Sequence, residues 1–476
     1  MLANTLTSVL LLASLASASP AAIEKRSFKV ERFANEKFTG NNGPQALAKA
    51  FRKFGMQMPE GLEAAVTNEK IARRRNKPDF LPLGLLTGLA DGLGGNAGGA
   101  DAGQQNGQGH RKAKGKNNGK AKGKGKGKGK GNKNQNGGAG NGTASATNQT
   151  GKVDAVPEQN DKEFLAQVKI GGQPVTLDFD TGSSDLWVFN TQLNAQVTNG
   201  HSVYDPTASK TFQALNGAKF SISYGDGSGA AGNVGLDVVD VGGAVFDQQA
   251  IELATDVSQT FVRDQNNDGL MGLAFSSINT VKPQKQKTFF DNVMPSLAEP
   301  VFTADLRKGA AGAYEFGKID TTKFQGDMTW VPINNKKGFW QFSSESFAVD
   351  GGQQQAGAQG GQAIADTGTT LLLADPTIVQ GYYSKVQGAQ NDKQSGGVTV
   401  PCDAQLPDLD LDIGGQYMAR IKGSDLNFAP VSNGRCFGGL QATQAGGLGV
   451  YGDILFKSQF VAFNGANNSI GLAPHA

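Results

Sequence analysis

Two aspartates, Asp180 and Asp366, occupy matching places in two similar segments and could do acid–base chemistry together. The segments are VTLDFDTGSSDLWV at 175–188 and GQAIADTGTTLLLA at 361–374, and in each an apolar run leads into Asp-Thr-Gly. Strands disfavour aspartate, and a buried carboxylate is costly unless it is paired or hydrogen-bonded. One copy alone would fit an Asx turn that caps a loop. Two copies, 186 residues apart, favour an internal duplication with a shared function.

If the two halves pack about a pseudo-twofold axis, the two loops meet and the carboxylates face each other. Two carboxylates in contact cannot both ionise cheaply, so they share one proton. The ionised aspartate can then take a proton from a water while the protonated one donates to a carbonyl, and the water attacks that carbonyl without a covalent intermediate. Three symmetric pairs of residues are expected to support the aspartates. Gly182 and Gly368 let the backbone approach the carboxylates, and Ser183 and Thr369 hydrogen-bond the outer carboxylate oxygens. Thr181 and Thr367 reach into the opposite half.

Other catalytic chemistries find little support in the sequence. The chain has three histidines, and neither a His-Glu-x-x-His motif nor a phosphate-binding Gly-Lys-Ser/Thr motif occurs. Residues 264–269 begin like a calcium loop, but the twelfth position is Phe275 where a glutamate is needed. We therefore expect no metal and no cofactor.

The chain has a basic front part and an acidic back part. Residues 1–152 hold 25 basic and 9 acidic residues, a net charge of +16, whereas residues 153–476 hold 20 and 33, a net charge of −13. Short apolar or alternating runs separated by Gly, Asn and Asp clusters fill the back part, which predicts an all-β fold. The clearest runs are 164–170, 175–180, 186–189, 220–224 and 238–246, with helical signals only near 291–297 and 376–386.

The front part is typical of a secretory precursor. Residues 1–19 form a short apolar segment followed by small residues, which predicts a signal peptide rather than a membrane span. Residues 20–152 would be a propeptide, with a helix near 44–54, basic cleavage sites at 25–26 and 73–75, and a Gly-Lys tract within 91–151. The tract cannot bury enough apolar surface to fold. A spacer removed on maturation is the favoured interpretation, and a polycation that persists and binds anionic polymers is the alternative.

Cys402 and Cys436 are the only cysteines. In a secreted protein they predict one disulfide that closes a surface loop, and two buried free thiols are the alternative. Three glycosylation sequons begin at Asn141, Asn148 and Asn467.

Residues 153–476 resemble the pepsin family, and most closely its fungal penicillopepsin and aspergillopepsin group. The resemblance rests on DFDTGSSDLWV, SYGDGSGAAG, NNDGLMGLAFSSINTV, IADTGTTLLL, the two-cysteine loop and YGDILFKSQFVAF. It implies a bilobal pepsin-like fold, with catalytic lobes at 153–327 and 328–476 and a central cleft for an extended peptide. It implies an aspartic endopeptidase with Asp180 and Asp366 as its catalytic pair.

The resemblance also implies roles for residues around the cleft. Tyr224 and Gly225 would lie at the tip of a hairpin, the flap, and Trp187 would donate a hydrogen bond to the Tyr224 hydroxyl. Asp226, supported by Ser228, matches a position that lets fungal members accept lysine before the scissile bond; an ordinary turn aspartate is the alternative. The remaining pocket residues would favour large apolar side chains: Tyr224, Phe261 and Leu270.

The expected partners are protein substrates, pepstatin-type inhibitors and the chain's own propeptide, with Lys53 as a candidate to occupy the catalytic pair. We expect a monomer that binds neither membranes nor, once mature, nucleic acid. A catalytically silent binding or inhibitor protein on the same scaffold is the rival, although such proteins typically lose a catalytic aspartate, a flap tyrosine or a motif glycine.

Overall fold

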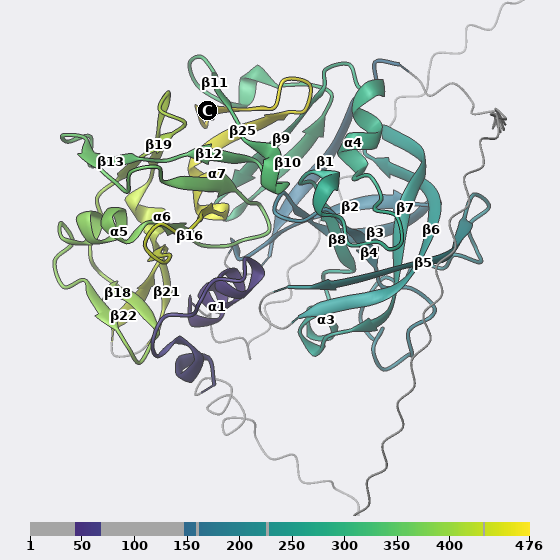
Figure 1. The fold of residues 1–476 in the computed structure, drawn as a ribbon, viewed down its shortest axis with the longest axis horizontal. Coiled ribbons are helices and arrows are strands. Elements are labelled where there is room, and N and C mark those ends of the chain that lie inside the picture. Colours follow the sequence, from purple (N-terminus) through teal and green to yellow (C-terminus); the bar gives the residue numbers. More distant parts are fainter. Residues whose placement is uncertain (1–42, 68–146, 159–160, 225–227, 432–433) are drawn as a thin grey trace, which may run out of the picture. The chain divides into compact units, whose positions relative to one another are not determined.

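Strands far outnumber helices in the described chain, as the sequence predicted, and the fold is the all-β, bilobal pepsin-like fold (Figure 1). The computed structural model describes residues 43–67, 147–158, 161–224, 228–431 and 434–476, all within the unit Asn41–Ala476. The expected signal peptide, both basic cleavage sites, nearly all of the Gly-Lys tract, and Gly225 and Asp226 lie outside the described residues. No described helix is both long and apolar enough to cross a membrane.

The elements up to residue 323 are α1 Gly43–Lys53, β1 Gly151–Pro157, β2 Phe164–Ile170, β3 Gln173–Asp180, β4 Leu186–Val188, β5 Gln213–Ser223, β6 Gly229–Val241, β7 Ala244–Val257, α3 Gln259–Arg263, β8 Gly269–Gly272, η2 Ser276–Ile278, α4 Phe289–Val293, η3 Met294–Ser296, β9 Val301–Arg307, β10 Ala310–Phe316 and η4 Thr321–Lys323.

The later elements are β11 Thr329–Pro332, η5 Asn335–Lys337, β12 Gln341–Ser343, β13 Ser346–Val349, β14 Gln355–Ala356, β15 Gln362–Ala365, β16 Leu372–Ala374, α5 Pro376–Tyr383, β17 Gln390–Asp392, β18 Gly397–Pro401, β19 Leu409–Ile413, β20 Tyr417–Ile421, α6 Gly423–Leu426, β21 Asn427–Pro430, β22 Arg435–Gly438, β23 Leu440–Ala442, β24 Gly449–Tyr451, α7 Asp453–Ser458, β25 Gln459–Asn464 and β26 Ser469–Pro474.

Local sequence explains several of these elements. In β1 buried and exposed residues alternate strictly, as expected for a strand with one face on the core. Helix α5 begins where Asp375 accepts a hydrogen bond from the Thr377 amide, and a proline at the first helical position has no amide to leave unpaired. β1 starts at Gly151, two residues before the lobe boundary expected at 152/153.

The internal duplication seen in the sequence is present in the strand topology. In the first half β3 pairs with β8 in parallel, β8 with β4 antiparallel, and β4 with β7 in parallel. In the second half β15, β24, β16 and β23 repeat these three pairings in the same order. Strands β8 and β24 are therefore equivalent, and the end of each lies in a similar sequence, Leu-Met-Gly at 270–272 and Val-Tyr-Gly at 450–452. Both catalytic candidates follow the same kind of strand, Asp180 as the last residue of β3 and Asp366 directly after β15.

One sheet contains strands from both halves. Its thirteen strands run in the order β11-β26-β25-β9-β10-β1-β2-β3-β8-β4-β7-β6-β5, so the last strands of the chain join the first half through β9. Stacked aromatic rings line this junction, with Phe302 on β9 parallel to Phe463 on β25 at a centroid distance of 4.5 Å. The strands of this junction are β9, β11, β25 and β26.

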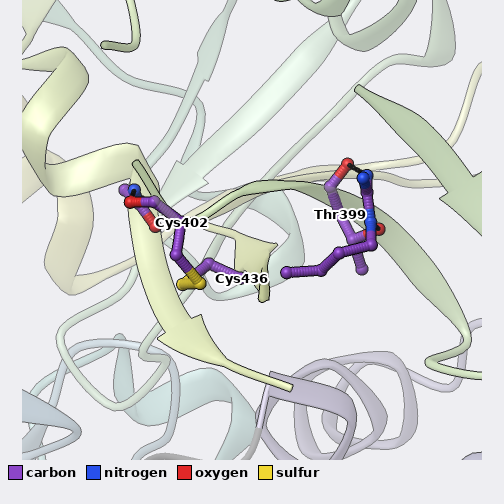
Figure 2. Close-up of a disulfide and its surroundings, with 5 residues drawn as sticks. Thr399, Cys402 and Cys436 are labelled. Carbon is purple, nitrogen blue, oxygen red and sulfur yellow. Dashed lines mark hydrogen bonds between the residues drawn. A yellow bond between two sulfur atoms is a disulfide. The ribbon is translucent and has the colours of Figure 1, made fainter. Parts of the chain in front are cut away.

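A disulfide joins Cys402 and Cys436, as predicted (Figure 2). Cys436 lies on β22 opposite Val400 of β18, and Cys402 follows β18 by one residue. The bond closes a loop of the second half with a sequence separation of 34.

Candidate active site

Asp180 and Asp366, which we call the dyad, are both almost completely buried, with exposures of 1% and 0%. Their surroundings are symmetric. Ser183 Oγ donates to Asp180 Oδ2 at 2.6 Å, and Thr369 Oγ1 donates to Asp366 Oδ2 at 2.5 Å. The amides of Gly182 and Gly368 donate to the Oδ1 atoms at 2.8 and 3.1 Å. Each carboxylate is thereby held in one orientation by its own loop.

The two loops are tied to each other by their threonines. The Thr181 amide donates to Thr367 Oγ1, and the Thr367 amide donates to Thr181 Oγ1, both at 3.0 Å. Each threonine hydroxyl also donates a hydrogen bond to a carbonyl of the other half. The Thr181 hydroxyl donates to the Ala365 carbonyl at 2.9 Å, and the Thr367 hydroxyl donates to the Phe179 carbonyl. All four bonds are buried and cross between the halves, so they fix the spacing of the dyad.

The glycines of the two motifs are required by close packing. A methyl group on Gly182 would lie 2.4 Å from Asp366 Oδ1, and one on Gly368 would lie 2.4 Å from Asp180 Oδ1. Both distances are far shorter than a carbon–oxygen contact allows. Each glycine therefore packs against the carboxylate of the other half, a symmetry that a single motif could not reveal.

Lys53, at the C-terminal end of α1, bridges the dyad. Its Nζ lies 2.8 Å from Asp180 Oδ1, 2.9 Å from Asp366 Oδ1 and 3.0 Å from Asp366 Oδ2. Its side chain is only 5% exposed. The residues of α1 that carry it are amphipathic, and one face, including Leu47 and Phe51, is buried. Lys53 is thus the residue that the sequence suggested for this position.

The three charges shift one another. Burial acts to lower the pKa of Lys53, but the two carboxylates outweigh it and raise that pKa. Burial acts to raise the pKa of Asp180, yet Lys53 and the bond from Ser183 lower it to about 2. For Asp366 burial prevails and raises the pKa to about 6, although Lys53 opposes the shift. The two carboxyls thus differ in acidity, as general acid–base chemistry by a pair requires.

The expected flap residues lie in a second apolar cluster beside the dyad. Trp187 Nε1 donates to the Tyr224 hydroxyl at 2.9 Å. The ring of Phe261 packs edge-on against both Trp187 and Tyr224, at centroid distances of 4.8 and 5.6 Å. Leu270 belongs to the same cluster. Ser228 is buried, and its carbonyl accepts from the Tyr224 amide at 2.8 Å, so the described ends of the hairpin are paired.

A second lysine of α1 contacts the later part of the chain at a place that the sequence did not predict. Lys49 Nζ lies 2.7 Å from Glu163 Oε1. Glu163 belongs to a group of three carboxylates with oxygens within 4.8 Å of one another, the others being Glu158 and Asp264. Burial acts to raise the pKa of Glu163, but Lys49 and then Lys162 outweigh it and lower that pKa to about 2. The available signal was spacing, because Lys49 precedes Lys53 by four residues and so shares its helix face.

Two further buried acids near the site were also not predicted. Asp178 precedes Asp180 by two residues in β3, and burial, reinforced by Glu163, raises its pKa well above the usual range. Glu252 on β7 is adjacent to Asp185, the last residue before β4. Strand periodicity could have placed Asp178 on the same face as Asp180. Nothing local in the sequence could have paired Glu252 with Asp185.

Comparison with known proteins gives a consistent result. The family profile described as eukaryotic aspartyl protease matches residues 163–475. Aspartic protease PEP3 of Coccidioides posadasii is 48% identical over 341 residues, which cover 70% of this chain and 77% of that protein. Penicillopepsin-1 of Penicillium rubens is 49% identical, covering 69% and 82%. Aspergillopepsin-1 of Aspergillus fumigatus is 46% identical, covering 70% and 84%.

Proposed function

The chain belongs to the eukaryotic aspartyl protease family, in its fungal pepsin-like group, and we propose that it is the inactive precursor of a secreted endopeptidase that works in acid. Asp180 and Asp366 are the proposed catalytic residues. The support is the symmetric dyad, whose two carboxyls are held in place by their own loops and by cross-lobe threonine bonds.

In the proposed reaction the dyad holds one proton and a water in place of the Lys53 ammonium. The ionised carboxylate takes a proton from the water, and the protonated carboxyl donates a hydrogen bond to the scissile carbonyl. The water attacks without a covalent intermediate, and the dyad then returns the proton to the leaving amine. Aspartic proteases are the standard example of such proton sharing. The Lys53 contacts support this, because they show that one polar atom reaches both carboxylates at once.

The proposed substrates are proteins with a large apolar residue, or a lysine, before the scissile bond. The apolar preference rests on the cluster of Tyr224, Trp187, Phe261 and Leu270. The lysine preference rests on the resemblance at Asp226, which lies outside the described residues. Loss of cleavage after lysine in Asp226→Ala, with cleavage after apolar residues kept, is the expected result; an unchanged product pattern would contradict the assignment.

The precursor form is proposed on two grounds. One is the sequence, with an expected signal peptide at 1–19 and a basic propeptide at 20–152. The other is α1, which buries its apolar face and places Lys53 on the dyad, where a substrate would need to bind. The mature enzyme would be an extracellular monomer that takes pepstatin-type inhibitors and binds neither membranes nor nucleic acid.

The rival is a silent binding protein on the same scaffold. Digestion of haemoglobin at pH 3–5, with and without pepstatin, distinguishes the protease from the binding protein. The proteins to compare are the wild type, Asp180→Asn and the control Asp327→Asn, whose side chain is exposed. We expect acid proteolysis that pepstatin and Asp180→Asn each abolish and that Asp327→Asn retains. Proteolysis that survives pepstatin or Asp180→Asn would overturn the assignment, and none in the wild type would favour the rival.

A further inference from the structure

A second pair of carboxyl groups is buried beside the flap tyrosine. Asp185, just before β4, and Glu252, on β7, are each 1% exposed. Asn279 Nδ2 donates to both, at 3.0 Å to Glu252 Oε1 and 3.4 Å to Asp185 Oδ1. Because one nitrogen reaches an oxygen of each group, the two carboxyls lie next to each other.

Each carboxyl has one oxygen that is satisfied and one that is not. Thr280 donates to Asp185 Oδ1 twice, through its amide at 3.0 Å and its hydroxyl at 2.6 Å. Asp185 Oδ2 and Glu252 Oε2 are buried and have no hydrogen-bond partner. A single proton between the carboxyls gives one of them a donor and the other an acceptor. Two ionised carboxylates would instead repel each other and leave both oxygens desolvated.

We propose that Asp185 and Glu252 share one proton and together act as positioning residues that hold Tyr224 in place only while that proton is present. Glu252 is in register with Trp187 across the parallel β4–β7 pair, so both side chains lie on the same face of the sheet. Trp187 is the hydrogen-bond donor to Tyr224. A second charge in the pair would therefore arise beside the contact that fixes the flap tyrosine.

The charges around the pair do little to offset a second negative charge. Lys285 acts to lower the pKa of Asp185, while burial and then the carboxylates of Asp180, Asp185 and Glu252 raise the pKa of the Tyr224 phenol. Lys285 is exposed and donates to the Ser277 carbonyl. Burial raises the pKa of Glu252 well above its usual range, with Asp185 adding to the shift. A folded-state pKa above the unfolded one means that the contribution is complete in acid and is lost as pH rises through the folded pKa.

The shared proton can be tested on the full chain by thermal unfolding between pH 4 and pH 8. Glu252→Gln keeps the shape and carries a permanent donor for Asp185 Oδ2. We expect its Tm relative to the wild type to rise toward neutral pH, by roughly 2–4 °C per pH unit above the ordinary carboxyl pKa. In that range the unfolded wild-type chain has lost the proton that the folded pair still holds, so each pH unit favours unfolding of the wild type. A Tm difference that does not change with pH would overturn the shared proton.

Two more variants serve as a second test of the shared proton and as a control for the loss of any buried carboxylate. Asp185→Asn supplies the donor from the other side and should give the same pH trend, which keeps the test decisive if Glu252→Gln does not fold. Asp237→Asn is the matched control, because Asp237 is equally buried but accepts from Tyr204, Thr211 and the Val238 amide. Its Tm should lie below that of the wild type and should not recover toward neutral pH.

The positioning role rests on the proposed function and has its own measurement. After acid activation, the ratio of peptidase activity in Glu252→Gln to that in the wild type should rise several-fold between pH 4 and pH 7. A constant ratio alongside a growing Tm difference would show that the pair stabilises the fold without positioning Tyr224. If the wild type cleaves no peptide, the proposed function and the positioning role fail together, while the Tm series still decides the shared proton.

Discussion

Replacing Lys53 with methionine should unmask the dyad in the unprocessed chain. Methionine keeps most of the apolar length of the lysine side chain but removes the ammonium that contacts Asp180 and Asp366. Helix α1 would still bury its apolar face, so the change acts on the charge contact rather than on the folding of the helix.

The size of the effect follows from burial. Lys53 is 5% exposed and the carboxylates are at most 1% exposed, so the contact is shielded from solvent. Removing one partner of a buried ion pair costs about 3–5 kcal/mol. If this cost falls on the α1-bound state, its equilibrium shifts toward release by a factor between about 10² and 4 × 10³. A ligand that needs the free dyad gains affinity by up to that factor.

The effect should also depend on pH in a defined direction. With Lys53 bound, the pKa of Asp180 is lowered to about 2, so the occupied dyad resists protonation more than the released dyad does. Release is therefore accompanied by proton uptake, and the hold of Lys53 is complete at neutral pH and is lost as the pH falls toward 2. Lys53→Met should flatten this dependence.

Binding of pepstatin to the unprocessed chain, measured by calorimetry at pH 6, separates release from catalysis. We expect Lys53→Met to bind at least about a hundred times more tightly than the wild type. Lys49→Met is the matched control, one helical turn earlier and also facing a carboxylate, Glu163. Lys49 is 28% exposed, so its loss should change the affinity by less than about tenfold. Equal affinities for the wild type and Lys53→Met would refute the assignment of Lys53 as the inhibitory contact.

Three further predictions concern a glycine beside the dyad, a threonine that joins the two halves, and the disulfide. Gly368→Ala places a methyl group 2.4 Å from Asp180 Oδ1, so the acid-activated variant should lose at least about 99% of kcat, as measured with a fluorogenic peptide; near-normal turnover would contradict the packing. Thr367→Val leaves the buried Thr181 amide without an acceptor and should cost about 1–3 kcal/mol in urea unfolding, and an unchanged midpoint would show that the cross-lobe bonds are dispensable. Loss of the disulfide in the double variant Cys402→Ala/Cys436→Ala should cost about 3–4 kcal/mol by the same assay while kcat is kept, whereas a fall in kcat would give the loop a catalytic role.

Much of the site follows from the sequence because its determinants are local or duplicated. The strand before each Asp-Thr-Gly motif, the glycines and the threonines all stand within three residues of an aspartate, and the two copies constrain each other. Apolar alternation likewise predicted β2 and β3 within a few residues of their observed ends. Cys402 and Cys436 required no choice, since only one pairing exists.

What could not be predicted depends on contacts between segments far apart in the chain. Glu252 meets Asp185 only because β7 pairs with β4 in parallel and in one register. Lys49 meets Glu163 only once α1 has packed on the other elements. Hydrophobic periodicity indicates which face of an element is buried, but not which distant element covers it.

The thirteen-stranded sheet has a consequence for how the enzyme could open. Because β9 is hydrogen-bonded to β25 on one side and to β10 on the other, parting the two halves would require breaking a ladder of backbone bonds. The distance between the two aspartates is therefore fixed when the chain folds, because the sheet holds the halves together. A peptide must therefore enter and leave the site while the backbone bonds that join the two halves stay intact.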